Sequence, residues 1–230
     1  MVRYNHRYIE ILGISLFLFY CFLMGMEIRS ETELRFHRDG YSILGIFLFQ
    51  ILLGYLGADF FSGLVHFLGD TFGTETTPIL GASFIKPFRD HHVDPKGMTK
   101  HDFVETSGNN CIVSLPPLLF VYHFVSINGS LFRYGFYVFF LSLMLFVFIT
   151  NQIHKWAHLE KPGKLLSFLQ NYHLILSPSH HSIHHTAPFN TYYCITVGWL
   201  NPILHHLKFF VCIRFFAEKT MGKWVVITKG

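Results

Sequence analysis

The chain of 230 residues has few charged side chains, since Asp, Glu, Lys and Arg make up only 14% of it. About 25% is typical of soluble proteins. Hydrophobic residues make up 51%, which excludes a disordered chain and disfavours an ordinary soluble enzyme. The net charge of +4 is small and no basic stripe occurs, so we expect no nucleic-acid partner.

Cysteine is also scarce, and the four cysteines include no CxxC pair. Their scatter excludes a disulfide framework and a zinc ribbon. Histidine, in contrast, occurs 16 times and outnumbers Asp and Glu, which total 14. An apolar chain gains no stability from so many imidazoles, so the histidines need a functional explanation.

Four stretches without charged residues are long enough, or nearly so, to cross a bilayer. They are residues 11–26, 41–58 (continuing past Asp59 to Gly69), 111–132 and 134–153. The third contains Pro116 and Pro117, so we expect its start to be kinked or interfacial. No small-residue cleavage site follows the first stretch, which we interpret as a retained helix. The sequence therefore predicts a single all-α, polytopic membrane domain over residues 1–230, with about four transmembrane helices.

The positive charges predict how these spans are oriented. Four spans would place both termini and the 69–110 loop on one face, together with 14 of the 18 Lys and Arg residues. The positive-inside rule makes that face cytoplasmic. Fourteen of the 16 histidines lie there or at its edge. We also expect residues 200–216 to form an amphipathic helix on the membrane surface.

His154 and His158 lie where the fourth span meets the cytoplasm. Their i, i+4 spacing puts both rings on one helix face, as a shared metal requires. Asn151 points the same way. The alternative is a pair of interfacial histidines without a ligand, whereas an HExxH zinc protease is excluded because Lys155 replaces the glutamate.

A second histidine cluster is the motif His180-His181-Ser-Ile-His184-His185. On a helix, His181, His184 and His185 would share a face. Neutral rings bound to a metal avoid the repulsion that charged rings would suffer. A pH-sensing cluster and a disordered metal-buffering tract are the alternatives, but such tracts are polar, and this context is apolar.

His66 and Asp70 repeat the i, i+4 spacing at the cytoplasmic end of the second span. Asp59, seven residues before His66, lies on the same face inside the membrane. An intramembrane carboxylate is costly and usually functional. Asp59 is therefore a candidate for orienting a histidine ligand, and a helix–helix hydrogen bond is the alternative.

The remaining candidate ligands are three histidines of the polar loop after the second span, where the alternative for each is a solvated loop residue, and one lone histidine before the His180 motif. They are His91, His92, His101 and His173. Together with the paired motifs they supply about nine or ten nitrogen ligands and one or two carboxylates, which suggests two metals. Imidazole with some carboxylate suits Fe, Zn, Cu or Ni.

A histidine-rich dimetal centre beside acyl chains fits the oxidation of lipid C–H bonds by iron and O₂. A metal transporter is the alternative from another class of protein. It would need polar residues throughout the spans, where polar residues such as Asp59, His123 and a few Ser and Thr are sparse.

Motifs from about Gly57 to Gly198 make the sequence similar to the plasmanylethanolamine desaturase family of membrane lipid desaturases. The matching stretches include Gly63-Leu-Val-His66, Phe84-Ile-Lys-Pro-Phe-Arg89, His101-Asp-Phe-Val-Glu-Thr106, Thr150-Asn-Gln-Ile-His-Lys-Trp156, His180-His-Ser-Ile-His-His185 and Thr191-Tyr-Tyr-Cys-Ile-Thr196. The resemblance implies a centre of two non-haem irons and an O₂-dependent desaturation. The implied substrate is a 1-O-alkyl ether phospholipid, whose alkyl chain becomes the vinyl ether of a plasmalogen.

The resemblance also implies a set of site residues. The implied metal ligands are His66, Asp70, His91, His92, His101, His154, His158, His173, His181, His184 and His185, with His101, His173 and Asp70 in less defined roles. Catalytic roles are expected for His154, His158, His184 and His185. Asp59 and Asn151 are expected to support the ligands.

The resemblance further implies an electron donor such as cytochrome b5 or a ferredoxin. Lys86 and Arg89 are candidates for binding the lipid phosphate, with positive-inside anchoring as the alternative. The membrane would be the inner or plasma membrane of a bacterium or the endoplasmic reticulum of a eukaryote. A desaturase or hydroxylase acting on another membrane lipid is the alternative activity.

Overall fold

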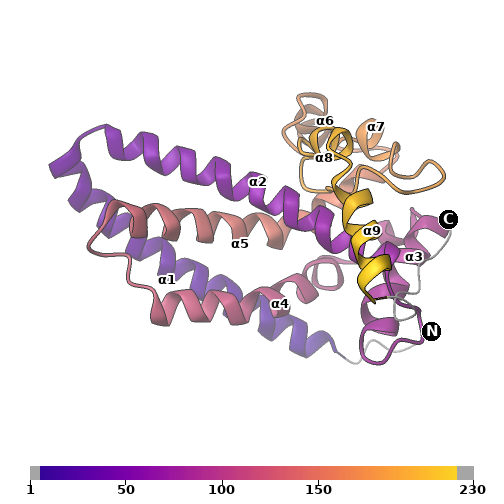
Figure 1. Ribbon diagram of the computed structural model, residues 1–230. Helices are drawn as coiled ribbons and strands as arrows, with labels where there is room; N and C mark the ends of the chain where they lie inside the picture. Colours follow the sequence, from indigo (N-terminus) through magenta and orange to yellow (C-terminus); the bar gives the residue numbers. More distant parts are fainter. Residues whose placement is uncertain (1–5, 222–230) are drawn as a thin grey trace. The chain divides into compact units, whose positions relative to one another are not determined.

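A computed structural model describes residues 6–221 of the chain, and within them it contains helices and no strand. The long helices are α1 (Arg7–Asp39), α2 (Ser42–Thr71), α4 (Phe103–Phe124) and α5 (Leu131–Ala157) (Figure 1). The short ones are the π-helix η1 (Gly81–Ile85), α3 (Lys86–Val93), the 3₁₀-helix η2 (Gly97–Lys100), α6 (Lys164–Asn171), α7 (Pro178–His181), α8 (Asn201–His206) and α9 (Phe209–Met221). The predicted all-α fold is confirmed.

Three helices, α1, α2 and α5, are long and apolar enough to cross a membrane. The third predicted span falls on α4, but its predicted limits of 111–132 are wrong at both ends. A capping box starts α4 at Phe103, because the Asp102 carboxylate accepts from the backbone N–H groups of Val104 and Glu105. The helix continues through Pro116 and Pro117 and ends at Phe124.

The chain divides into two compact units, and the first comprises Met1–Ala58 and Asp102–Gln152. Helices α1 and α4 pack closely in it (Figure 1). Glycine permits the close approach of α2 to α5, because a Cβ on Gly54 would lie 2.6 Å from Ser142 Cβ. The apolar core of this unit includes Phe17, Met24 and Tyr137, all fully buried.

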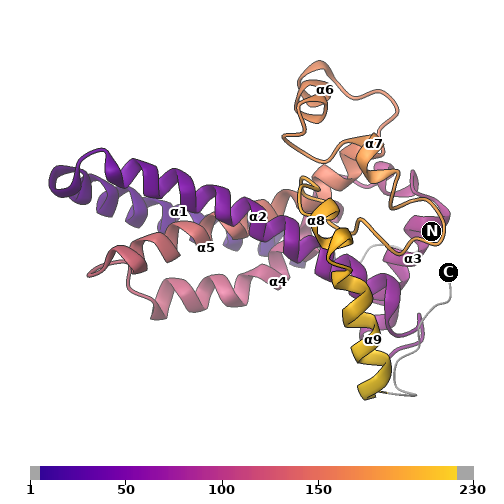
Figure 2. The same ribbon diagram turned by 45° about the horizontal axis from the view of Figure 1, so that its top comes forward.

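The second unit comprises Asp59–His101 and Ile153–Gly230, and it contains all of the candidate ligands. Its core is small: Phe67 packs with Tyr193 and Phe210. Figure 2 shows α6 and α7 joined by an irregular segment. This unit therefore consists largely of short helices and loops.

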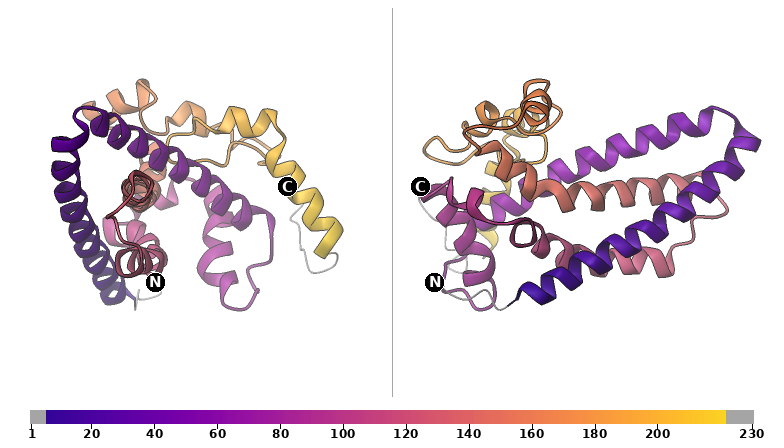
Figure 3. Two further views of the ribbon diagram at one scale, coloured as in Figure 1. Left: turned by 60° about the vertical axis from the view of Figure 1, so that its left-hand side comes forward. Right: turned by 180° about the vertical axis from the view of Figure 1, so that it is seen from behind.

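The amphipathic helix predicted over residues 200–216 is interrupted in the structure. Helix α8 ends at His206 and α9 begins at Phe209, with a change of direction between them (Figure 3). Lys208 has a φ of +52°, a left-handed conformation that a continuous helix excludes. Both helices carry exposed apolar residues, including Ile203 on α8 and Phe215 on α9. The predicted position on the membrane surface stays a prediction.

The predicted orientation of the termini depends partly on residues outside the described range. Arg3, Lys223 and Lys229 were counted among the positive charges of the cytoplasmic face. They lie in segments 1–5 and 222–230, outside the described residues. Their contribution to the charge asymmetry is therefore known from the sequence alone.

Candidate metal centre

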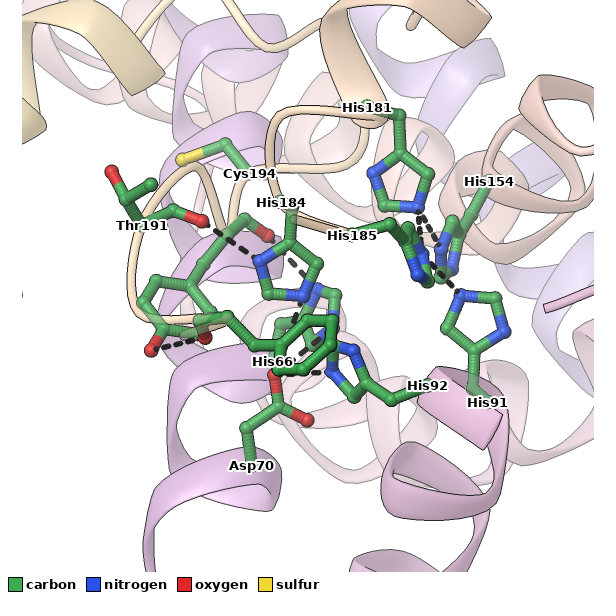
Figure 4. Close-up of polar contacts among 12 residues, drawn as sticks. His66, Asp70, His91, His92, His154, His181, His184, His185, Thr191 and Cys194 are labelled. Carbon is green, nitrogen blue, oxygen red and sulfur yellow. Dashed lines mark hydrogen bonds and ion pairs between the residues drawn. The ribbon is translucent and has the colours of Figure 1, made fainter. Parts of the chain in front are cut away.

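Two groups of side chains in the second unit converge as metal ligands do (Figure 4). Within each group the candidate ligand atoms all lie within 4.8 Å of one another. The five-histidine cluster consists of His91, His154, His158, His181 and His185. The carboxylate cluster consists of His66, Asp70, His92 and His184.

The five-histidine cluster is held together by imidazole nitrogens that face one another. The Nε2 atom of His181 lies 2.8 Å from that of His154 and 3.0 Å from that of His185. The Nε2 atom of His185 lies 3.1 Å from that of His91. The buried Nε2 atom of His158 has no hydrogen-bond partner. Several nitrogen lone pairs therefore converge on one point, which suits a shared cation.

The carboxylate cluster is arranged around Asp70. The Oδ2 atom of Asp70 lies 3.0 Å from His92 Nε2 and 3.4 Å from the Nε2 atoms of His66 and His184. His66 and His184 are fully buried, and the side chain of Asp70 is 9% exposed. Three imidazoles and one carboxylate thus surround a small volume that is shielded from solvent.

Backbone carbonyls orient two rings of the carboxylate cluster. His66 Nδ1 lies 3.1 Å from the carbonyl oxygen of Tyr193, and His184 Nδ1 lies 2.7 Å from that of Thr191. A carbonyl can only accept, so each Nδ1 carries the proton and each Nε2 keeps its lone pair. Both Nε2 atoms are buried without a hydrogen-bond partner. Metal-binding histidines have this arrangement, and the residues present therefore fit a metal.

Burial keeps the rings of the five-histidine cluster neutral. Burial first, and then the neighbouring imidazoles, lower the pKa of His158 to about 4 and that of His185 to about 3. The same causes, burial first, lower the pKa of His91 and of His181. Metal binding requires deprotonated ligands, so these rings are ready to bind a cation at neutral pH.

Two pairs of consecutive histidines each divide between the clusters. His91 belongs to the five-histidine cluster and His92 to the carboxylate cluster, and His185 and His184 divide in the same way. Consecutive residues of a helix point about 100° apart, because a turn contains about 3.6 residues. One short segment can therefore contribute to both clusters, as α3 and the turn after α7 do.

Two of the predicted ligands, His101 and His173, belong to neither cluster. Both are exposed, and each instead contributes its backbone carbonyl. Lys155 Nζ donates to the carbonyl of His101, and Trp199 Nε1 donates to that of His173 at 2.8 Å. Their spacing in the sequence does not distinguish these two histidines from His91 and His92, which do belong to the clusters.

The two residues expected to support the ligands have different partners from those predicted. The buried Asp59 carboxylate accepts from the backbone N–H groups of Val197, Gly198 and Leu200 at 2.8–3.1 Å. It thus holds the segment that follows Tyr193. Asn151 donates to Asn110 Oδ1 at 3.1 Å, inside the first unit.

The two phosphate-binding candidates already have protein partners. Lys86, about half exposed, pairs with Asp90 at 2.9 Å and with Glu75 at 3.6 Å. Arg89 donates to the carbonyl of Gly73 at 2.8 Å. Arg89 therefore supports the loop after α2, whereas Lys86 remains accessible.

Sequence reasoning missed the backbone acceptors of Thr191 and Tyr193, because a carbonyl group leaves no trace in residue type. It also missed Asn201, which is 2% exposed and bonds to Cys194. The motif Thr191-Tyr-Tyr-Cys-Ile-Thr196, which carried part of the family resemblance, was the available signal.

Comparisons with known proteins agree with this geometry. The family model for the lipid desaturase domain matches residues 55–224. Plasmanylethanolamine desaturase from Myxococcus xanthus is 52% identical over 171 residues, which are 74% of this chain and 60% of that protein. Plasmanylethanolamine desaturase 1 from Mus musculus is 48% identical, over 69% of this chain and 60% of that protein.

More distant relatives include fatty acid desaturase 4-like 2, a chloroplastic protein of Arabidopsis thaliana. It is 34% identical over 74% of this chain and 59% of its own length. The chain thus spans about three fifths of the length of each of these curated relatives. No solved structure matches it.

Proposed function

Since the chain belongs to the lipid desaturase domain family, we propose that it desaturates the 1-O-alkyl chain of ether phospholipids to the vinyl ether of plasmalogens. The observation that carries this proposal is a pair of adjoining ligand clusters in a chain about half identical to two proteins named plasmanylethanolamine desaturase. The apolar helices α1, α2 and α5 fit a membrane enzyme whose substrate is a membrane lipid.

The proposed ligands are the members of the two clusters, with one iron in each. Imidazole and carboxylate suit iron, although zinc, copper and nickel also bind such donors. Iron fits the reaction because two bound iron ions would supply the redox chemistry needed to remove C–H hydrogens with O₂. The protein contributes oriented rings: the carbonyls of Thr191 and Tyr193 fix two of them. His154, His158, His184 and His185 keep the catalytic roles expected of them.

The proposed reaction takes two hydrogens from adjacent carbons of the alkyl chain, starting beside the ether oxygen. One O₂ is reduced to two waters, which requires the two hydrogens, two electrons and two protons. A small carrier such as cytochrome b5 or a ferredoxin would supply the electrons. Burial of His66 and His184 excludes solvent from the carboxylate cluster, which protects reactive species from side reactions.

The remaining parts of the proposal concern the setting of the enzyme. One membrane-embedded desaturase domain spans residues 1–230, and both termini are cytoplasmic because of the positive-inside rule. The membrane is the inner or plasma membrane in a bacterium and the endoplasmic reticulum in a eukaryote. Lys86, exposed on α3, is the better candidate for attracting the lipid phosphate, because Arg89 is engaged with backbone carbonyls.

The test is expression in cells that make alkyl ether but no vinyl ether phospholipids. Acid-labile plasmalogen should appear with the wild-type chain and be absent with His184→Ala, while the variant stays in the membrane at equal amount. Iron content is measured on the same purified protein. If cells that express the wild-type chain contain no plasmalogen although the purified protein contains iron, the assigned substrate is wrong.

Desaturation of a phospholipid acyl chain is the second candidate, because the Arabidopsis relatives are named fatty acid desaturases and are 31–34% identical. The product separates the candidates. A vinyl ether is cleaved by acid, whereas an acyl double bond survives acid and remains after ester hydrolysis. A mass gain of one oxygen would instead indicate a hydroxylase.

A further inference from the structure

The peptide group that joins Tyr193 to Cys194 has hydrogen bonds on both sides. Its carbonyl oxygen lies 3.1 Å from His66 Nδ1 and accepts the proton of that ring nitrogen. Its N–H group, on Cys194, donates to Asn201 Oδ1 at 2.8 Å. A single peptide therefore connects the amide of Asn201 to a ring of the carboxylate cluster.

The orientation of the Asn201 amide is fixed by its other contacts. Its Nδ2 atom donates to the carbonyl of Cys194 at 2.9 Å and lies 3.2 Å from His180 Nε2. A carbonyl can only accept, so the NH₂ group must occupy that position and the oxygen must face the N–H of Cys194. The side chain is 2% exposed, and water does not compete for these bonds.

Hydrogen bonds arranged in series through a peptide strengthen one another in a low-dielectric interior. Donation from the Cys194 N–H to Asn201 polarises the peptide and makes the Tyr193 carbonyl a better acceptor. A better acceptor at Nδ1 raises the electron density at Nε2 of His66. That Nε2 atom is buried, lacks a hydrogen-bond partner and faces Asp70.

We infer that Asn201 is a positioning residue, which acts through the Tyr193–Cys194 peptide to orient and strengthen His66 as a ligand for metal in the carboxylate cluster. The inference rests on the proposed metal-dependent function. Its effect is confined to one cluster, because the hydrogen bonds of Asn201 within the described part of the chain go to Cys194 and His180, and neither belongs to the five-histidine cluster. The five-histidine cluster therefore serves as an internal reference.

The test measures metal binding rather than turnover. Purified full-length protein is stripped with a chelator, reloaded with Co²⁺ and dialysed against graded Co²⁺ concentrations, with bound cobalt and its visible absorption followed. Asn201→Leu removes the acceptor at similar volume. Asn201→Asp keeps an acceptor oxygen for the Cys194 N–H and, because burial favours the protonated carboxyl, also a donor for the Cys194 carbonyl. Two control variants are Ser62→Ala, which removes the 3.0 Å bond from Ile195 N in the next peptide, and Asn190→Ala at an exposed position.

We expect Asn201→Leu to weaken one of two cobalt sites by about tenfold, at the low end of what outer ligand partners contribute. The other site should keep its affinity and spectrum. Asn201→Asp should restore most of the lost affinity, and both control variants should bind within about twofold of the wild type, far below that range.

Three results would overturn the inference: unchanged binding by Asn201→Leu, equal weakening by the Leu and Asp variants, or equal weakening of both sites. The last would mark a general loss of structure. A wild-type chain that binds no metal would instead overturn the proposed function, and the inference with it.

Discussion

The two ligand clusters differ in how their rings are held in place. In the five-histidine cluster, the Nε2 atoms of His154, His181 and His185 lie within hydrogen-bond distance of other rings of the cluster. In the carboxylate cluster, His66 and His184 are each bonded to a backbone carbonyl at Nδ1 and face the carboxylate of Asp70 at Nε2. The rings of one cluster contact one another, whereas two rings of the other are fixed by backbone carbonyls.

This difference has an electrostatic consequence. A divalent ion among five neutral imidazoles keeps its full charge of +2, whereas Asp70 reduces the net charge of the other site to +1. The protein thus offers two unequal environments to two ions, and bound ions dominate the local electrostatics of each. Substitutions that affect only one cluster test whether this inequality is real.

The largest effect is expected from His181→Ala, which removes the ring that contacts both His154 and His185. Its loss removes the nitrogen that lies close to two other rings, so the four remaining rings should hold a metal much less tightly. We expect the vinyl ether product to fall by at least about 100-fold, the upper range for disrupted metal sites. The lipid assay measures the product and elemental analysis the metal.

The control for that variant is His206→Ala, which removes an exposed histidine of α8 that belongs to neither cluster. Product formation should remain at the wild-type level in this variant. Wild-type product from His181→Ala would show that the five-histidine cluster is not needed for the reaction.

Asp70→Asn should distinguish the clusters most directly. The substitution preserves shape but removes the negative charge that faces His66, His92 and His184. We expect metal affinity in the carboxylate cluster to fall by about 10- to 100-fold and the five-histidine cluster to retain its metal. Equilibrium dialysis measures both sites. Asp94→Asn, at an exposed aspartate, is the control; equal loss from both clusters would refute the assignment.

The sequence predicted the parts of this centre that lie on long helices. The pairs His66–Asp70 and His154–His158 have i, i+4 spacing, and each pair shares a cluster as expected. The first pair lies on α2, whereas α5 carries His154 and ends at Ala157, one residue before His158. Local periodicity suffices there because a helix fixes the directions of its own side chains.

The sequence could not predict how the loops complete the clusters. His91 and His92 were expected in the site, but only the path of α3 sends them to different clusters. His101 and His173 have equally suitable side chains and remain outside. The carbonyls of Thr191 and Tyr193 depend on left-handed residues such as Phe189 and Tyr192, whose φ angles are +57° and +61°. Such conformations are rare for these residue types and are not encoded by hydrophobic periodicity.

Asp59→Asn should affect the carboxylate cluster more weakly than Asp70→Asn does. Asp59 accepts three backbone N–H groups from residues 197–200, and an amide nitrogen in place of one oxygen would face one of these donors. The segment that carries the Tyr193 carbonyl would then be held less firmly. We expect about a tenfold loss of metal affinity in the carboxylate cluster alone, measured as above. An unchanged affinity would show that the segment is rigid without Asp59.

The smallest effect is expected from Lys86→Ala, which separates attraction of the substrate from orientation of the rings. Lys86 is about half exposed and shares its charge with Glu75 and Asp90. One lysine near an anionic surface contributes about 1 kcal/mol, or roughly fivefold. We therefore expect KM for the ether phospholipid to rise by up to about fivefold, with kcat and both metal affinities unchanged.

Lys100→Ala, at another exposed and ion-paired lysine, is the control. An equal rise in KM for both variants would mean that lysines of this unit attract lipid without a specific site, whereas a changed metal affinity would tie Lys86 to the carboxylate cluster.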